Sequence, residues 1–111
     1  MVETNKLRHR ALKRDAVLEK KAQAWADYLT GGSVCKYDHQ NPLPRMSRAE
    51  NIAATGGKSM TGKSVVAEQW GTSYGHRKNM LNEGYSRIGV GIGWGCKMQG
   101  MDGQVAVALY A

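Results

Sequence analysis

Two runs near the end of the chain alternate large and small residues with a strict period of two. The runs are SRIGVGIGW, residues 86–94, and QVAVALYA, residues 104–111. Because successive side chains of a β-strand point to opposite faces, this period predicts two strands, each with a large-residue face and a small-residue face. The small face can accept a closely packed helix. The large positions are Ile88, Val90, Ile92 and Trp94 in the first run and Val105, Val107 and Leu109 in the second.

The nine residues between these runs, GCKMQGMDG, contain Gly95, Gly100 and Gly103, which suits a hairpin loop. The first third of the chain is helical in pattern instead. Helices first and an antiparallel hairpin last predict an α+β protein with helices packed on a small sheet. A chain of 111 residues with 41% hydrophobic residues suits one globular domain over residues 1–111.

A helix is predicted over residues 16–30. Asp15 can cap its N-terminus, Glu19 places an acid in its first turn, and Gly31 and Gly32 can end it. Its apolar residues recur on one face, as expected for a helix packed on a core. They are Leu18, Ala22, Trp25, Ala26 and Leu29.

The remaining elements are less regular. Leu7, Ala11 and Leu12 have helical spacing and predict a helix over about residues 4–13. Residues 33–62 contain both prolines and many polar residues, and they predict a long loop with extended pieces near residues 36–39 and 51–53. A loop of this length in a compact domain is usually functional or poorly ordered.

A further helix is predicted over about residues 62–73, with Thr61 as its cap and Trp70 on its apolar edge. Gly75 is expected to break this helix. The short segment from His76 to Leu81 can then form another.

The chain carries a formal net charge of +7, which favours anionic partners in general. Lys6, Arg10, Lys13 and Arg14 would share roughly one face of the first predicted helix, either as a solvated face or as a face that contacts phosphates. This face has no interleaved aromatic residues, and the chain shows no nucleic-acid-binding module. We therefore expect no specific nucleic-acid partner.

The two cysteines, Cys35 and Cys96, form no CxxC pair, so neither a zinc ribbon nor a redox motif is indicated. One disulfide and two buried free thiols both remain open. No stretch approaches the ~18–20 apolar residues needed to span a membrane. The N-terminal residues, MVETNKLRHR, lack the apolar region of a signal peptide, so the chain is either intracellular or a mature form without its leader.

Two histidines lie at breaks between predicted elements, His39 and His76, and Glu50 precedes an apolar step in AENIA. Each has a structural interpretation, as a hydrogen-bonded histidine or a paired loop carboxylate. Together they would suit a divalent metal or proton transfer. His9 lies in a basic segment and is interpreted as solvated surface. No GxSxG, P-loop, Rossmann fingerprint or HExxH motif is present.

Four segments resemble the CAP superfamily, which comprises cysteine-rich secretory proteins, antigen 5 and plant pathogenesis-related proteins and is also called the SCP domain. The resemblance covers nearly the whole chain. The GHR and ENI motifs in this order carry it most specifically. The segments are NKLRHRALKRDAVLEKKAQAWADYL, YDHQ, AENIA and WGTSYGHRKNMLNEGYSRIGVGIG, which match the two opening helices, the first site histidine, the GEN-I motif and the GHR form of smaller members.

The resemblance implies an α-β-α sandwich with a central antiparallel sheet. It also implies a cleft of two histidines and two glutamates, in which the histidines of several members bind zinc or another divalent cation. His39, Glu50 and His76 match three of these positions. Ser73 stands where larger members carry the second glutamate, so Ser73 is expected near the cleft as a hydrogen-bonding residue at a helix end.

The resemblance further implies an extracellular protein that binds a small molecule, a lipid or sterol, or a host protein, with a role in defence or host interaction. A metal-assisted hydrolase that uses His39, Glu50 and His76 is the alternative, and a basic domain that binds anionic polymers is another. Two histidine ligands predict loose, pH-dependent metal binding, in which Glu50 orients one of them. A Cys35–Cys96 bridge fits a secreted protein and is also predicted.

Overall fold

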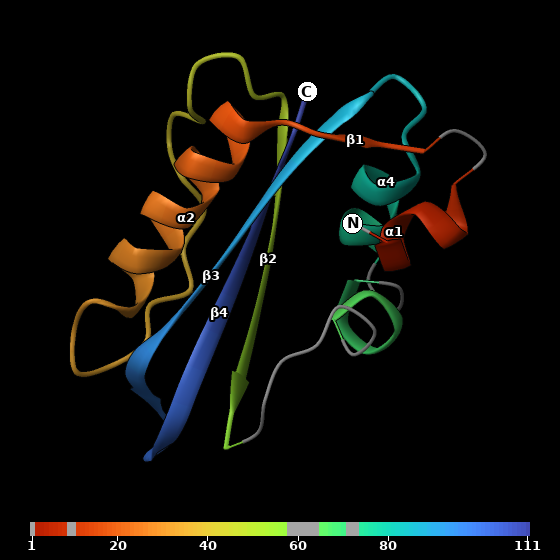
Figure 1. Ribbon diagram of the computed structural model, residues 1–111. Coiled ribbons are helices and arrows are strands. Elements are labelled where there is room, and N and C mark those ends of the chain that lie inside the picture. Colours follow the sequence, from red (N-terminus) through yellow and green to blue (C-terminus); the bar gives the residue numbers. More distant parts are fainter. Residues whose placement is uncertain (1, 9–10, 58–64, 71–73) are drawn as a thin grey trace.

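A computed structural model describes residues 2–8, 11–57, 65–70 and 74–111. The described part forms a four-stranded sheet in the order β1-β3-β4-β2, with α2 on one face and α1, η1 and α4 on the other (Figure 1). The elements are α1 (Val2–Leu7), β1 (Lys13–Arg14), α2 (Ala16–Thr30), β2 (Ala49–Gly56), the π-helical segment η1 (Val65–Trp70), α4 (Tyr74–Leu81), β3 (Arg87–Met98) and β4 (Met101–Tyr110).

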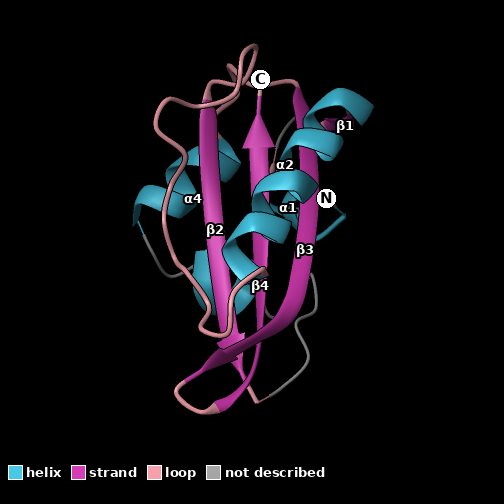
Figure 2. Ribbon diagram, turned by 90° about the vertical axis from the view of Figure 1, so that its left-hand side faces the viewer, coloured by secondary structure: helices cyan, strands magenta, loops and turns pink. Residues whose placement is uncertain are grey.

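The central strand of the sheet is β4, which pairs antiparallel with β3 on one side and with β2 on the other (Figure 2). β1 adds two residues parallel to the start of β3. The predicted α+β sandwich is therefore confirmed. The parallel β1 is an addition that the expected antiparallel sheet did not include.

α2 occupies the residues predicted for it. Its N-cap is Asp15, whose carboxylate accepts hydrogen bonds from the backbone N–H groups of Val17 and Leu18 at 2.9 and 3.0 Å. Such a cap satisfies N–H groups that a helix leaves without partners in its first turn. The buried stripe of the helix faces the sheet and packs on apolar side chains of β2 and β4. Its members are Leu18, Ala22, Ala26 and Leu29.

The glycines of β3 explain how closely α2 packs on the sheet. A methyl group placed on Gly91 would come within 2.4 Å of the backbone of Gln23, and one on Gly89 would come within 2.1 Å of the backbone of Glu19. A side chain at either position would push the helix off the sheet. The expectation that the small-residue face accepts a closely packed helix is therefore confirmed for β3. In β4 it is wrong, because the large residues of that strand pack in the cluster with α2 and its alanines lie in the cluster on the other face.

The opposite face of the sheet carries a second apolar cluster. Trp70 of η1, Met80 of α4 and Tyr110 of β4 are each no more than 3% exposed and pack together there with smaller residues of the sheet. Burial of large side chains of this kind contributes about 1.5–3 kcal/mol each. This cluster fixes α4, and with it the segment that carries His76, against the sheet.

Several predicted boundaries are wrong. The first helix ends at Leu7 instead of about Lys13, because Lys13 and Arg14 pair with β3. The shared helical face predicted for four basic residues therefore does not form: Lys13 and Arg14 lie in β1, Arg10 lies outside the described residues, and nothing is described of the side chain of Lys6. Arg14 contacts Glu19 instead, at 2.7 Å.

The predicted hairpin loop is also too long. β3 and β4 continue through most of residues 95–103, and the turn between them is confined to Gln99 and Gly100.

Gly75 does not break a helix but lies inside α4. In the long irregular region, the extended piece expected near residues 51–53 belongs to the eight-residue strand β2, whereas residues 36–39 form no strand.

Cys35 and Cys96 form a disulfide, which joins the segment after α2 to the far end of β3. Backbone hydrogen bonds accompany it: the N–H of Cys35 donates to the carbonyl of Lys97, and the N–H of Lys97 donates to the carbonyl of Ser33, both at 2.9 Å. The predicted bridge is therefore present in the structure. Among the described residues, no helix combines the length and the apolar character needed to cross a membrane.

In the described part of the chain β2 is an edge strand, and side chains bond to the backbone of its outer edge. The carbonyl of Ile52 accepts hydrogen bonds from the hydroxyl of Tyr37 at 2.8 Å and from the indole N–H of Trp70 at 3.0 Å. The carbonyl of Glu50 accepts one from the amide of Asn79 at 3.3 Å. Satisfied edge groups cannot template pairing with a further strand. The same side chains bring two distant parts of the chain to this edge, and the candidate site lies there.

Candidate functional site

A pocket of about 430 Å³ opens beside the free edge of β2. The segment between α2 and β2 supplies one wall, α4 supplies the other, and Glu50 of β2 lies between them. All three charged or titratable residues predicted for the site, His39, Glu50 and His76, line it together. The other lining residues are Gln40, Leu43, Gly75 and Asn79.

The segment between α2 and β2, which supplies His39 to the pocket, runs along the side of the sheet that α2 covers (Figure 1). The indole N–H of Trp25 in α2 donates a hydrogen bond to the carbonyl of Asp38 at 2.9 Å. The hydroxyl of Tyr37 donates one to the carbonyl of Ile52 in β2. These two contacts fix the residues immediately before His39. The His76 wall comes from the opposite face, so the two histidines meet at the edge of the sheet.

Glu50 is the buried centre of the His39 half. One carboxylate oxygen, Oε1, lies 2.8 Å from Nδ1 of His39 and accepts the backbone N–H of Gln40 at 3.1 Å. The other, Oε2, accepts the side-chain amide of Gln40 at 2.8 Å. The side chain of Glu50 is 2% exposed, and a buried carboxylate needs partners of this kind. With three contacts made, Glu50 serves to orient His39, leaving Nε2 of that ring for a ligand.

His76 lies in the first turn of α4, and its environment differs from that of His39. Its Nδ1 atom is buried and has no hydrogen-bond partner among the described residues. Burial lowers the pKa of His76, and the nearby charge of His39 lowers it further. The neutral imidazole is therefore favoured, which is the form that binds metals. The ring of Trp70 lies beside it, with centroids 6.4 Å apart.

Sequence reasoning missed two polar residues of this pocket, Gln40 and Asn79. Gln40 follows His39 directly, and its side-chain amide donates a hydrogen bond to the carboxylate of Glu50. Asn79 lies three residues after His76, a spacing that shares one face of a helix. The helical spacing could have signalled Asn79. Ser73, which was expected near the cleft, lies outside the described residues.

Among the described side chains that line the pocket, the two imidazoles are those that would suit a metal ion. Among the residues that the structure describes, no three histidine, cysteine or acidic side chains converge in a way that could hold a metal ion. His39 and His76 are the side chains of this pocket whose ring nitrogens suit zinc, since Glu50 is occupied by three contacts with His39 and Gln40. A cation held here would take its other ligands from water or from a bound molecule.

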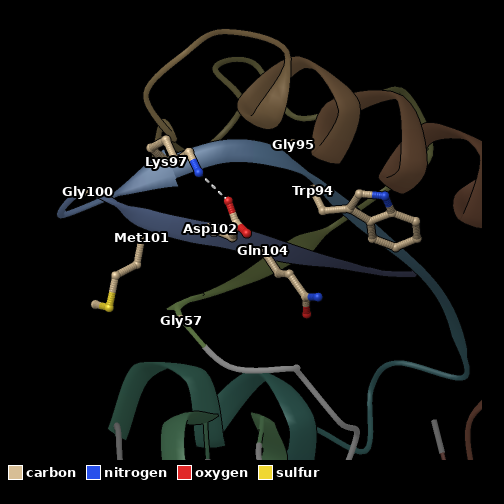
Figure 3. Close-up of a pocket in the computed structure, with 9 residues that line it drawn as sticks. Gly57, Trp94, Gly95, Lys97, Gly100, Met101, Asp102 and Gln104 are labelled. Atoms are coloured by element: carbon tan, nitrogen blue, oxygen red, sulfur yellow. Dashed lines mark hydrogen bonds and ion pairs between the residues drawn. The ribbon is translucent and has the colours of Figure 1, made fainter.

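A second, larger hollow of about 860 Å³ lies at the far end of the sheet, near the β3–β4 turn (Figure 3). Trp94 is 68% exposed at one side of it and Met101 lies at the other. Its two charged lining residues, Lys97 and Asp102, form an ion pair with each other. None of the described residues predicted for the site lines this hollow, and its charged groups are paired with each other, so we take the pocket beside β2 as the candidate site.

Comparison with protein families identifies a family for nearly the whole chain. The family model described as the cysteine-rich secretory protein family, CAP, matches residues 5–110. A search of curated proteins returned no matching relative. The family match spans α2, the whole sheet and both walls of the pocket, and it covers nearly all of the chain. The chain belongs to the CAP family of cysteine-rich secretory proteins.

Proposed function

We propose that this CAP domain is a binding protein whose cleft takes up a divalent cation, with zinc as the first candidate, between His39 and His76. One observation carries the proposal: the two imidazoles, from opposite faces of the sheet, line one pocket, and Nδ1 of His39 is held at 2.8 Å by the buried carboxylate of Glu50. A carboxylate that fixes one ring nitrogen of a ligating histidine is the usual support of a zinc site.

The residues present fit such a cation, though weakly. Glu50 leaves Nε2 of His39 for a ligand, and burial lowers the pKa of His76, which favours the neutral form that binds metals. Because Nδ1 of His76 is out of contact with solvent, Nε2 is the nitrogen that remains for a ligand. Two protein ligands give a weaker site than the three or four of typical zinc proteins. When bound, the cation would offer open positions to water or to an anionic group of a second ligand.

Binding is better supported than hydrolysis. A general base must be free to take a proton from water, but both oxygens of Glu50 already accept hydrogen bonds from His39 and Gln40. The carboxylate is also 2% exposed, which keeps it from a water in the open pocket. We therefore assign to Glu50 the orientation of His39, and we treat metal-assisted hydrolysis as the alternative.

We also propose that the protein acts outside the cell, where a small molecule, a lipid or sterol, or a host protein would be its partner. The Cys35–Cys96 disulfide supports this location, since disulfides persist in oxidising compartments. The +7 charge favours an anionic partner. Pull-down with immobilised sterol and with anionic lipid vesicles tests the lipid version, which fails if neither retains the protein.

Calorimetric titration with zinc at pH 7.5 tests the cation proposal. We expect heat from the wild type and none from the double variant His39→Ala and His76→Ala. His9→Ala is the matched control, since it removes a histidine remote in sequence from both walls, and it should bind like the wild type. Equal heats from the wild type and the double variant would refute the site. At pH 5 the wild-type signal should fall, because protonated imidazoles do not bind metal.

A further inference from the structure

A fully buried amide lies between β2 and α4, directly behind the pocket. The side chain of Asn51 is 0% exposed, and its Nδ2 atom donates to the backbone carbonyl of His76 at 3.0 Å and to the hydroxyl of Tyr110 at 3.2 Å. Its Oδ1 atom accepts a hydrogen bond from Asn79 at 2.9 Å. The same amide of Asn79 donates to the carbonyl of Glu50 at 3.3 Å. These contacts link β2, α4 and β4 around His76.

The hydrogen-bond donors and acceptors around Asn51 allow only one orientation of its carboxamide. A carboxamide has two N–H donors, and those of Asn51 go to His76 and Tyr110. The backbone carbonyl of His76 can only accept, so the amide of Asn51 cannot be turned over without losing that bond. A buried group that loses its partner is costly, so the amide holds one orientation. The main chain of His76 is therefore tied to a fixed point on β2.

Glu50 and Asn51 are consecutive residues of the same strand, and each holds one wall of the pocket. Glu50 binds the ring of His39 through its side chain, whereas Asn51 binds the main chain of His76. Because adjacent side chains of a strand point to opposite faces, one dipeptide reaches the segments on both sides of the sheet. The placement of both histidines therefore depends on two consecutive residues of β2.

We propose that Asn51 is the positioning residue for His76, and that the Glu50–Asn51 dipeptide sets the relative placement of the two histidines in the cleft. The expected effect on cation affinity rests on the proposed function. The structural part of the proposal, the fixed placement of His76, holds or fails independently of any cation.

The test uses Asn51→Ala, with Ile52→Val as the control. Ile52 is the next residue of β2, is also fully buried, and packs in the cluster beneath α2 instead of against α4. Two readouts are compared on folded protein: zinc affinity by calorimetry, and the ¹H–¹³C ring resonances of His39 and His76 in metal-free protein. Ile52→Val reports any general loosening of the strand.

We expect Asn51→Ala to shift the ring resonances of His76, leave those of His39 nearly unchanged, and weaken zinc binding by about tenfold or more, as loss of an outer-shell partner does. Ile52→Val should leave the resonances of both rings in place. Unchanged His76 resonances in Asn51→Ala would overturn the proposal. If the wild type takes up no zinc, the proposed function fails, and the metal-free spectra still decide the role of Asn51.

Asn79→Ala is the second variant should Asn51→Ala not fold. Asn79 is half-buried, and its removal withdraws the donor to Oδ1 of Asn51 while leaving the Asn51 amide in place. A smaller shift of the His76 ring resonances in the same direction supports the proposal. Ring resonances that match those of the wild type would overturn it.

Discussion

The buried carboxylate of Glu50 holds the exposed imidazole of His39: their side chains are 2% and 58% exposed, and Oε1 lies 2.8 Å from Nδ1. The pair joins the edge of the sheet to a segment with no regular secondary structure. A polar contact made from inside the protein thus fixes an imidazole that faces solvent. The ring can meet a ligand without having to be ordered at that moment, which lowers the entropic cost of binding.

Glu50→Gln should weaken zinc binding by about 10- to 100-fold, because an amide holds the His39 ring less firmly and makes its free nitrogen less basic. Calorimetry measures the change. Glu19→Gln is the control: it also neutralises a glutamate, but Glu19 pairs with Arg14 at the start of α2, away from the pocket. Equal zinc affinities in Glu50→Gln and the wild type would show that the carboxylate does not support the histidine.

Two glycine substitutions should have opposite effects on stability. Gly75 lies inside α4, and a methyl group added there meets no atom within 4 Å. Gly75→Ala should therefore raise the free energy of unfolding by about 0.4–1 kcal/mol, since alanine restricts the unfolded chain without strain in the folded one. Gly91→Ala should lower it by about 3 kcal/mol, because its methyl group would overlap the backbone of α2.

Urea denaturation of both variants and the wild type checks this pair. A loss of stability in Gly75→Ala would mean that the helix does not continue through Gly75. A neutral Gly91→Ala would mean that α2 lies farther from β3 than the structure places it.

The elements that could be predicted from sequence are those whose local pattern agrees with their packing. α2 carries a cap at Asp15 and an apolar stripe, and its predicted bounds were those observed. The alternation in β3 and β4 predicted both strands, and that in β3 also predicted the closely packed helix. In these segments, the residues that favour an element also build the contacts that retain it, so local evidence was enough.

The predictions that were wrong or incomplete share one physical cause. They depend on tertiary contacts, which the local periodicity of the sequence does not reveal. Lys13 and Arg14 lie in a segment with helical spacing, but pairing with Arg87 and Ile88 draws them into a strand. The meeting of His39 and His76 depends on an edge strand far from both in sequence, which no spacing rule encodes. The family resemblance supplied that placement, and it gave no sign of Gln40, whose role rests on a side-chain contact.

Arg8 should be among the most sensitive positions for stability. Its side chain is fully buried and donates to the carbonyls of Met80, Asn82 and Tyr85 at 2.6, 3.0 and 2.8 Å, around the end of α4. Arg8→Met leaves the buried carbonyl of Met80 and two partly buried carbonyls without that donor, and since a buried acceptor without a partner costs roughly 1–3 kcal/mol, a loss of about 3 kcal/mol is expected.

Arg8→Lys should recover part of this loss, since an ammonium group keeps the charge but cannot reproduce the planar fork of donors. Thermal unfolding followed by circular dichroism ranks the three proteins. If Arg8→Lys matches the wild type, charge alone matters and the fork geometry is not required.

His76 should make folding stability depend on pH between about 5 and 7. Its pKa in the folded protein is lowered, chiefly by burial and then by the charge of His39, so the unfolded chain binds a proton more readily. The contribution of neutral His76 to the free energy of unfolding is complete above the ordinary histidine pKa of 6.5. It declines as the pH falls below that value. His76→Gln should flatten this part of the profile, measured by denaturation at pH 7.5 and pH 5. A wild-type profile that His76→Gln leaves unaltered would contradict the assignment.

The Cys35–Cys96 disulfide closes a span of 61 residues that contains β2, η1, α4 and most of β3. By the chain-entropy argument, a loop of that length stabilises the fold by about 4 kcal/mol, because the unfolded chain loses conformational freedom. The double variant Cys35→Ala and Cys96→Ala should therefore unfold at lower urea concentration. Dithiothreitol should shift the wild type toward the variant and leave the variant unchanged. A double variant as stable as the oxidised wild type would show that the backbone bonds between Ser33, Cys35 and Lys97 hold this corner by themselves.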